Sequence, residues 1–305
     1  MQSSTFEAMV MLQLQVLMLT GAGFILSKTG VITPQGRKSM ADLLISFLLP
    51  CNIICSFQMK LSGEIVASCA SILVLASLAQ VVYLIAGKLL FPGEKAGRLS
   101  CLRYATLCSN AGFLGLPIIG GVYGEMGTLL TSVALLPQRV VMWSVGLSFF
   151  THTDGKSVLK KTLTHPCIVA VVAGFALMVI GNPPLPAFVQ KSLSAASGCT
   201  TCMSMLVIGG ILAEAGRVDV KDKTLLWFTL ARLILIPLTM FALLTLAGTD
   251  KLVLGVMVLM SGMPAGSTTA ILASKYGGDA AFASCMVFIS TIASMVTLPL
   301  LCLLL

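Results

Sequence analysis

Apolar runs of about 20 residues follow one another along the chain and are separated only by short polar segments. A helix needs about 20 mostly apolar residues to cross the hydrocarbon core of a bilayer. Charged residues make up only 10% of the sequence, against about 25% in an average soluble domain. The pattern therefore predicts an all-α, multi-pass membrane protein with ten transmembrane helices. The predicted spans are 6–26, 39–58, 65–90, 99–121, 125–150, 165–181, 187–213, 224–247, 252–275 and 279–304.

Lysines and arginines are unequally divided between the polar segments. Of the 19 in the chain, 14 lie in or beside the loops that follow odd-numbered spans, and three lie in the loops that follow even-numbered spans. Arg139 and Arg232 lie inside spans. Cytoplasmic loops carry an excess of Lys and Arg. We therefore expect a plasma-membrane protein with both termini extracellular or periplasmic. The same distribution explains the net charge of +8 without a nucleic-acid partner.

The order of the spans repeats once along the chain. Spans 1 and 6 begin 159 residues apart (165 − 6), and spans 4 and 9 begin 153 apart (252 − 99). This divides the chain into a first repeat at 1–150, a cytoplasmic loop at 151–164 and a second repeat at 165–305. Because five is odd, the second repeat enters the membrane from the opposite side. Such inverted repeats are typical of secondary transporters.

Glycine, proline and small polar residues interrupt spans 4 and 9, which occupy corresponding positions in the two repeats. Proline removes a backbone donor, and glycine tolerates the unwound conformations that follow. Polar backbone groups freed at this depth must line a cavity or bind something, and the positive end of each half-helix favours an anion. A simple proline kink is the alternative for either span alone. The candidate substrate-binding residues are Asn110, Ala111, Gly112, Gly115, Pro117, Pro264, Ala265, Gly266, Ser267 and Thr268.

Arg139 and Arg232 lie well inside predicted spans, where each costs roughly 2.5–3.5 kcal/mol on insertion scales. No carboxylate lies at a comparable depth in the sequence. Their partner is therefore either an anionic substrate or the backbone carbonyls of an interrupted helix. Asn52 and Gln138 are neutral polar candidates, with packing as the alternative for each. The two histidines, His152 and His165, lie in or beside the fifth loop, and we expect neither a metal nor a cofactor.

The chain resembles the auxin efflux carrier family, which includes plant PIN proteins and bacterial organic-acid permeases. Asn110 to Pro117 resembles the fourth-helix pattern of that family, and Pro264 to Tyr276 resembles its ninth helix. Unlike plant PIN proteins, the chain has no long cytoplasmic loop, and it has Ser109 where a second proline is common. It is therefore more similar to the bacterial members. The remaining matching stretches are Pro50, Arg232 to Pro237, and Thr291 to Pro299.

The resemblance implies ten helices, with helices 4 and 9 crossing at the midplane. It also implies a scaffold of helices 1, 2, 6 and 7, a mobile domain of helices 3–5 and 8–10, and an elevator-type homodimer that carries small organic anions such as malate, malonate or auxin-like acids. A sodium-coupled symporter of the bile-acid type is the first alternative, and an intramembrane sensor or receptor is the second. The spans contain no HExxH motif, paired aspartates or Ser/His pair, so we do not expect an enzyme.

Overall fold

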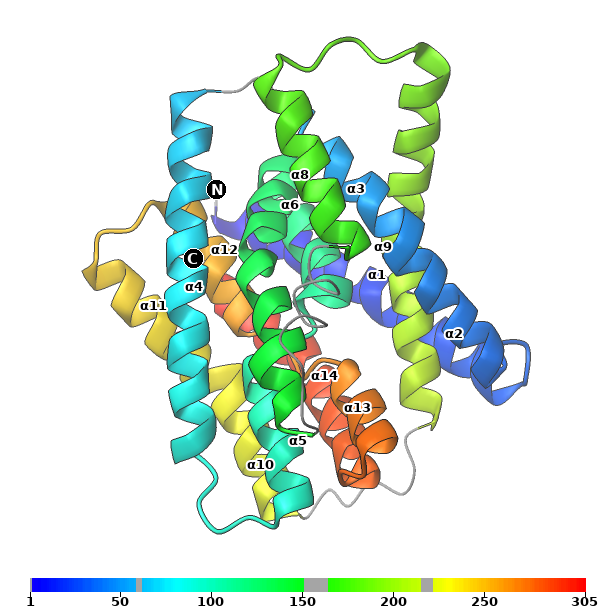
Figure 1. Cartoon of the computed structure of the whole chain (residues 1–305), viewed down its shortest axis with the longest axis vertical. Coiled ribbons are helices and arrows are strands. Elements are labelled where there is room, and N and C mark those ends of the chain that lie inside the picture. The colour runs from blue at the N-terminus through cyan, green and yellow to red at the C-terminus, as the bar shows by residue number, and fades with distance from the viewer. Residues whose placement is uncertain (1, 59–61, 151–163, 215–221) are drawn as a thin grey trace.

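The computed structural model describes residues 2–58, 62–150, 164–214 and 222–305. These residues form helices and contain no strand, which confirms the predicted all-α class. Figure 1 shows α4 and α11 at one edge of the bundle and α2 and α9 at the opposite edge. The α-helices are α1 (Gln2–Lys28), α2 (Pro34–Leu43), α3 (Leu49–Ser56), α4 (Gly63–Leu89), α5 (Ala96–Leu107), α6 (Leu116–Val141), α8 (Pro166–Val179), α9 (Ala187–Glu214), α10 (Lys223–Leu230), α11 (Ile236–Leu246), α12 (Lys251–Ser261), α13 (Thr268–Tyr276) and α14 (Ala280–Cys302).

Short π-helical turns adjoin several of these helices. Three of the turns lie within longer, continuous apolar helices. The turns are η1 (Leu44–Leu48), η2 (Ala111–Gly115), η3 (Met142–Gly146) and η4 (Ala231–Leu235). Within the described ranges, six helices are long and apolar enough to cross a membrane, and three apolar helices are shorter. The six are Pro34–Ser56, Gly63–Leu89, Ala111–Val141, Ala187–Ala213, Lys223–Leu246 and Ala280–Cys302; the three are Leu14–Lys28, Pro166–Val179 and Lys251–Ser261.

Gly124 divides α6 into two helices, 116–123 and 125–141. Its φ of 64° and ψ of −151° are not helical, and a positive φ is readily adopted only by glycine. A side chain at Gly120 would come within 2.5 Å of Thr128 Oγ1, although eight residues of straight helix span roughly 12 Å. The chain therefore turns back on itself at Gly124, between the fourth and fifth spans predicted from the sequence.

Most of the helix packing falls within two groups, although α1 also packs on α14 and α3 on α6. In the first group α1 packs on α9, and α3 packs on α8 and α9; in the second, α4 packs on α5 and α6, α11 on α12, and α13 on α14. Glycines bring α1 and α9 into backbone contact, because a Cβ at Gly23 would lie 2.4 Å from Leu206 O and one at Gly209 would lie 2.1 Å from Thr20 O. Small residues of this kind allow membrane helices to approach closely.

Arg98 connects the first turns of three helices in the second group. Asp222 caps α10 by accepting two backbone N–H groups, and Asp279 caps α14 by accepting the N–H of Phe282. Arg98, in the first turn of α5, donates from Nη1 to Asp222 at 2.8 Å and from Nε to Asp279 at 3.2 Å. The ends of α5, α10 and α14 are thereby fixed relative to one another.

Candidate functional site

Two non-helical segments meet inside the second group of helices. The first, residues 108–110, separates α5 from η2, and the second, residues 262–267, separates α12 from α13. The Asn110 N–H donates to the carbonyl of Pro264 at 2.9 Å, and the Gly266 N–H donates to the carbonyl of Cys108 at 3.1 Å. The two segments therefore run antiparallel and pair through their backbones. This pairing satisfies polar groups that lipid could not satisfy.

Gly266 makes this close approach possible. A Cβ at this position would lie 2.8 Å from the carbonyl oxygen of Cys108 and 3.4 Å from that of Ser109. Ala265, which pairs with Ser109 in the antiparallel bridge, donates its N–H to Ser290 Oγ at 3.2 Å. A larger residue at 266 would push the two backbones apart.

Arg232 holds the ends of the two preceding helices together. Its Nη1 donates to the carbonyl of Thr106 in the last turn of α5 at 2.8 Å, and its Nε donates to the carbonyl of Met263, just after α12, at 3.0 Å. The guanidinium carbon lies 5.3 Å from the ring centroid of Tyr83, and the side chain is 1% exposed. The negative ends of two helix dipoles thus stabilise this buried charge. Arg232 does not line the cavity described next.

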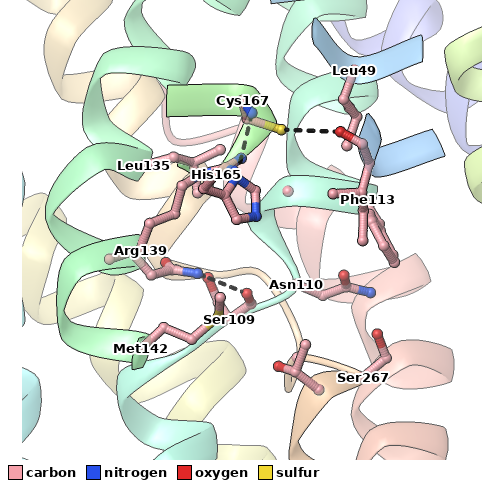
Figure 2. Close-up of a pocket in the computed structure, with 15 residues that line it drawn as sticks. Leu49, Ser109, Asn110, Phe113, Leu135, Arg139, Met142, His165, Cys167 and Ser267 are labelled. Atoms are coloured by element: carbon pink, nitrogen blue, oxygen red, sulfur yellow. Dashed lines mark hydrogen bonds between the residues drawn. The ribbon is translucent and has the colours of Figure 1, made fainter. Parts of the chain in front are cut away.

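A cavity of about 100 Å³ lies beside the paired segments. Figure 2 shows the side chains that surround it. Polar groups come from the two segments and from α6 and the start of α8, whereas η1, α3 and neighbouring turns supply apolar groups. The lining residues are Ile45, Leu49, Ser109, Asn110, Gly112, Phe113, Leu135, Gln138, Arg139, Met142, His165, Cys167, Gly266, Ser267 and Thr268.

Asn110 presents a side-chain amide to this cavity. It occupies the N-cap position of η2, yet its side chain makes no capping hydrogen bond there, and the residue is only 5% exposed. Ser267 and Thr268 lie at the N-terminus of α13, where the helix dipole is positive. Gly112 also borders the cavity, and a Cβ there would meet no atom within 4 Å. These groups could bind an anion without placing an acid beside it.

Gln138 anchors the first non-helical segment to α6. Its Nε2 donates to the carbonyl of Ser109 at 2.9 Å, and its Oε1 accepts from the Ser109 hydroxyl at 3.2 Å. Both ends of the Gln138 amide are therefore occupied by Ser109. Gln138, one of the candidate site residues, borders the cavity, but its amide holds the backbone of Ser109 in place.

Arg139 and His165 supply the charge and the imidazole of the cavity. Nη1 of Arg139 lies 3.1 Å from Nδ1 of His165, and Figure 2 shows the imidazole beside the end of the arginine side chain. Arg139 is 9% exposed. His165 is expected from the sequence in or beside the fifth loop and is not among the predicted site residues. Its position directly before Pro166 and an apolar run indicates the N-cap of a helix, and this is the sequence signal that could have identified it.

The other predicted site residues lie outside this cavity. Ala111, Gly115, Pro264 and Ala265 are buried around the crossing of the two segments. Asn52 and Pro117 line a second cavity of about 440 Å³, where the Asn52 Nδ2 donates to Ser197 Oγ at 2.9 Å. In the described part of the chain, no group of three or more His, Cys, Asp or Glu side chains is arranged to hold a metal ion.

Comparison with known proteins identifies similar sequences along nearly the whole chain. The family described as "Membrane transport protein" matches residues 8–157 and 150–302. An uncharacterized transporter of Methanothermobacter thermautotrophicus is 27% identical over 294 residues, which cover 94% of this chain and 95% of the relative. An uncharacterized transporter of Methanocaldococcus jannaschii is 25% identical over 304 residues, with 93% of this chain and 95% of the relative covered.

Proposed function

The chain belongs to the membrane transport protein family, the auxin efflux carrier family that its motifs resemble, and on this premise we propose that it is a secondary carrier of small organic anions. Carboxylates such as malate, malonate or auxin-like acids are the proposed substrates. The observation that carries the proposal is the set of groups around one cavity: the Asn110 amide, the Arg139 guanidinium and the N-terminus of α13.

Electrostatics favours an anion in this cavity over a cation or a neutral solute. Among the described residues that line it, Arg139 is the one with a permanent charge. A carboxylate that leaves water must regain hydrogen bonds, and those made to charged groups are worth roughly 1.5–3 kcal/mol each. Phe113, Leu135 and Met142 would contact the apolar part of an organic acid.

The proposed architecture is ten transmembrane helices in two inverted repeats, 1–150 and 165–305. The turn at Gly124 supports it, because this turn divides the 31-residue helix Ala111–Val141 into two. The helices α1, α2–α3, α8 and α9 would form the scaffold, and α4–α6 and α10–α14 would form the mobile domain. The packing of the helices into these two groups supports elevator-like motion between them. A homodimer follows from the family resemblance.

The two cavities support alternating access. Ile45 and Leu49 line the first cavity, whereas Asn52 and Ser56, about seven residues further along the same helix, line the second. Seven residues of helix correspond to roughly 10 Å. The cavities therefore lie at different heights along this helix, which correspond to different depths in the proposed membrane orientation. We propose that the mobile domain carries the anion between these depths.

A thermal-shift screen of the purified protein tests the proposed function. A ligand that binds the folded state raises the apparent melting temperature by mass action. We expect malate, malonate or indole-3-acetate to raise Tm, and the corresponding neutral amides to leave it unchanged. Repeating the screen with choline in place of sodium tests the sodium-coupled alternative. Stabilisation by the amides and not by the acids would contradict the proposal.

A further inference from the structure

The imidazole of His165 is held in its neutral form by two donors. Nδ1 lies 3.1 Å from Arg139 Nη1 and accepts the backbone N–H of Cys167 at 3.3 Å. A guanidinium can only donate hydrogen bonds. Nδ1 is therefore the acceptor in both contacts, and the ring proton is on Nε2. A proton at Nδ1 would remove both contacts and place a second positive charge beside Arg139.

The Arg139–His165 contact joins the two groups of helices. Arg139 lies on α6, which packs against α4, whereas His165 caps α8, which packs against α3 and η1. In the proposed carrier, these two side chains belong to the mobile domain and the scaffold respectively. Any motion between the two parts must break this contact or replace it.

Among the described residues that line the cavity beside His165, no carboxylate could replace it. From α6 the charged group that lines the cavity is Arg139, and η1 and α3 contribute the apolar Ile45 and Leu49. On α8 itself the other titratable group is Cys167, whose Sγ donates to the carbonyl of Ile45 at 3.8 Å. Within the described lining, a carboxylate can therefore come only from a bound solute.

We propose that His165 is a proton-binding site that is coupled to anion binding at Arg139. The carboxylate of the solute takes the place of the imidazole at Nη1. Nδ1 then gives up its remaining contact with the Cys167 N–H and takes up one proton from the buffered solution. The carboxylate then lies between a guanidinium and an imidazolium, so that one anion and one proton bind together. This inference rests on the proposed function, and it names the proton as the coupling ion.

Electrostatics gives the direction of the coupling. In the empty cavity, the guanidinium opposes a positive charge on the imidazole 3.1 Å away. A bound carboxylate favours the same charge. By linkage, the proton and the anion each raise the affinity of the other by the same factor. The affinity for the anion therefore falls as the pH rises.

Isothermal titration of the purified full chain tests the proposal, with malate, malonate and indole-3-acetate as probes. Titrations in two buffers of unlike ionisation enthalpy give the number of protons taken up. We expect uptake of up to one proton per anion wherever the complex keeps the His165 proton that the free protein has lost. The titrations therefore run from about pH 5 to pH 8, on both sides of the ordinary imidazole pKa of about 6.5. Kd should rise with pH by at most about tenfold per unit, the limit for one linked proton.

The variant His165→Asn isolates the role of the imidazole. Asparagine keeps an oxygen acceptor and is a good N-cap, but it does not titrate. We expect this variant to bind the anion with the high-pH affinity of the wild type at every pH, and to take up no proton. His165→Ser, also a good N-cap, replaces it if the Asn variant does not fold. His152→Asn removes the other histidine of the chain and should behave as wild type.

Three results would overturn the inference. Anion binding by the wild type without proton uptake would leave the proposed function intact and remove proton coupling. Proton uptake that persists in His165→Asn or His165→Ser would place the proton elsewhere. Failure of all three acids to bind the wild type would overturn the proposed function and this inference with it.

Discussion

Asn110 is the residue whose replacement tests the proposed anion site most sharply at the scale of a single side chain. Its amide faces the cavity and makes no capping hydrogen bond. We expect Asn110→Ala to weaken anion binding by about one to two decades, since a hydrogen bond to a charged group is worth roughly 1.5–3 kcal/mol and ~1.4 kcal/mol is tenfold. Titration of the purified variant with malate, malonate or indole-3-acetate measures this change.

Asn110→Asp distinguishes a ligand from a helix cap. A carboxylate at this position would repel the carboxylate of the substrate, so this variant should bind more weakly than Asn110→Ala. Aspartate is also a good N-cap, and a purely capping Asn110 would tolerate it. Normal binding by the Asp variant, with an unchanged Tm, would show that Asn110 is a cap.

The two buried arginines should respond differently to the same substitution. Arg139 lines the cavity, whereas Arg232 binds the carbonyls of Thr106 and Met263. Arg139→Gln should raise KM for the anion about tenfold or more, the effect of one charged hydrogen bond, with a small change in Tm. Arg232→Gln should lower Tm, because an unpaired buried acceptor costs about 1–3 kcal/mol.

Transport assays and melting curves of both arginine variants provide the test. Arg232→Lys should not restore Tm fully, because an ammonium lacks the fork of donors that reaches two carbonyls. A large loss of stability in Arg139→Gln, with an unchanged KM, would assign the structural role to Arg139 instead.

Two glycines near the crossing of the non-helical segments allow a controlled comparison of how closely the helical elements pack. A Cβ at Gly266 would overlap the backbone of Cys108, whereas a Cβ at Gly112 would enter open space beside the cavity. Gly266→Ala should therefore destabilise the protein by about 1–3 kcal/mol, as overpacking does. Gly112→Ala should keep Tm near the wild-type value and lower the affinity for larger acids. Melting curves and titrations of both variants separate these effects; equal losses of Tm would contradict them.

The sequence predicted the all-α class because apolar runs are a local feature. Apolar runs mark helices, and the glycines and prolines of 109–117 and 261–269 mark places where a regular helix is disfavoured. The identity of the groups that meet at the cavity could not be read in the same way. His165 reaches Arg139, and Arg232 reaches Thr106, only through packing of helices distant in the sequence. The sequence alone therefore does not distinguish backbone contact from substrate contact for Arg232, whereas the structure shows that it binds backbone carbonyls.

At the scale of the whole molecule, the distribution of basic residues predicts the orientation in the membrane. The loop with Lys160 and Lys161 should be cytoplasmic; it lies outside the described residues. The test introduces Val158→Cys into a chain whose ten native cysteines are replaced. We expect this cysteine to react with an impermeant maleimide only when the cytoplasmic face is accessible. Reaction in intact cells from the outside alone would reverse the proposed topology.

Solute exchange across a sealed membrane tests most directly the proposal that the chain is an organic-anion carrier whose site lies beside the paired segments 108–110 and 262–267. Purified protein is reconstituted into liposomes loaded with unlabelled malate, malonate or indole-3-acetate, and entry of the same labelled acid is followed. We expect saturable counterflow of at least one acid. Asn110→Ala should reduce this counterflow about tenfold or more, whereas Cys199→Ala, at an exposed position on α9, should leave it unchanged. No counterflow of any acid, or undiminished counterflow in Asn110→Ala, would contradict it.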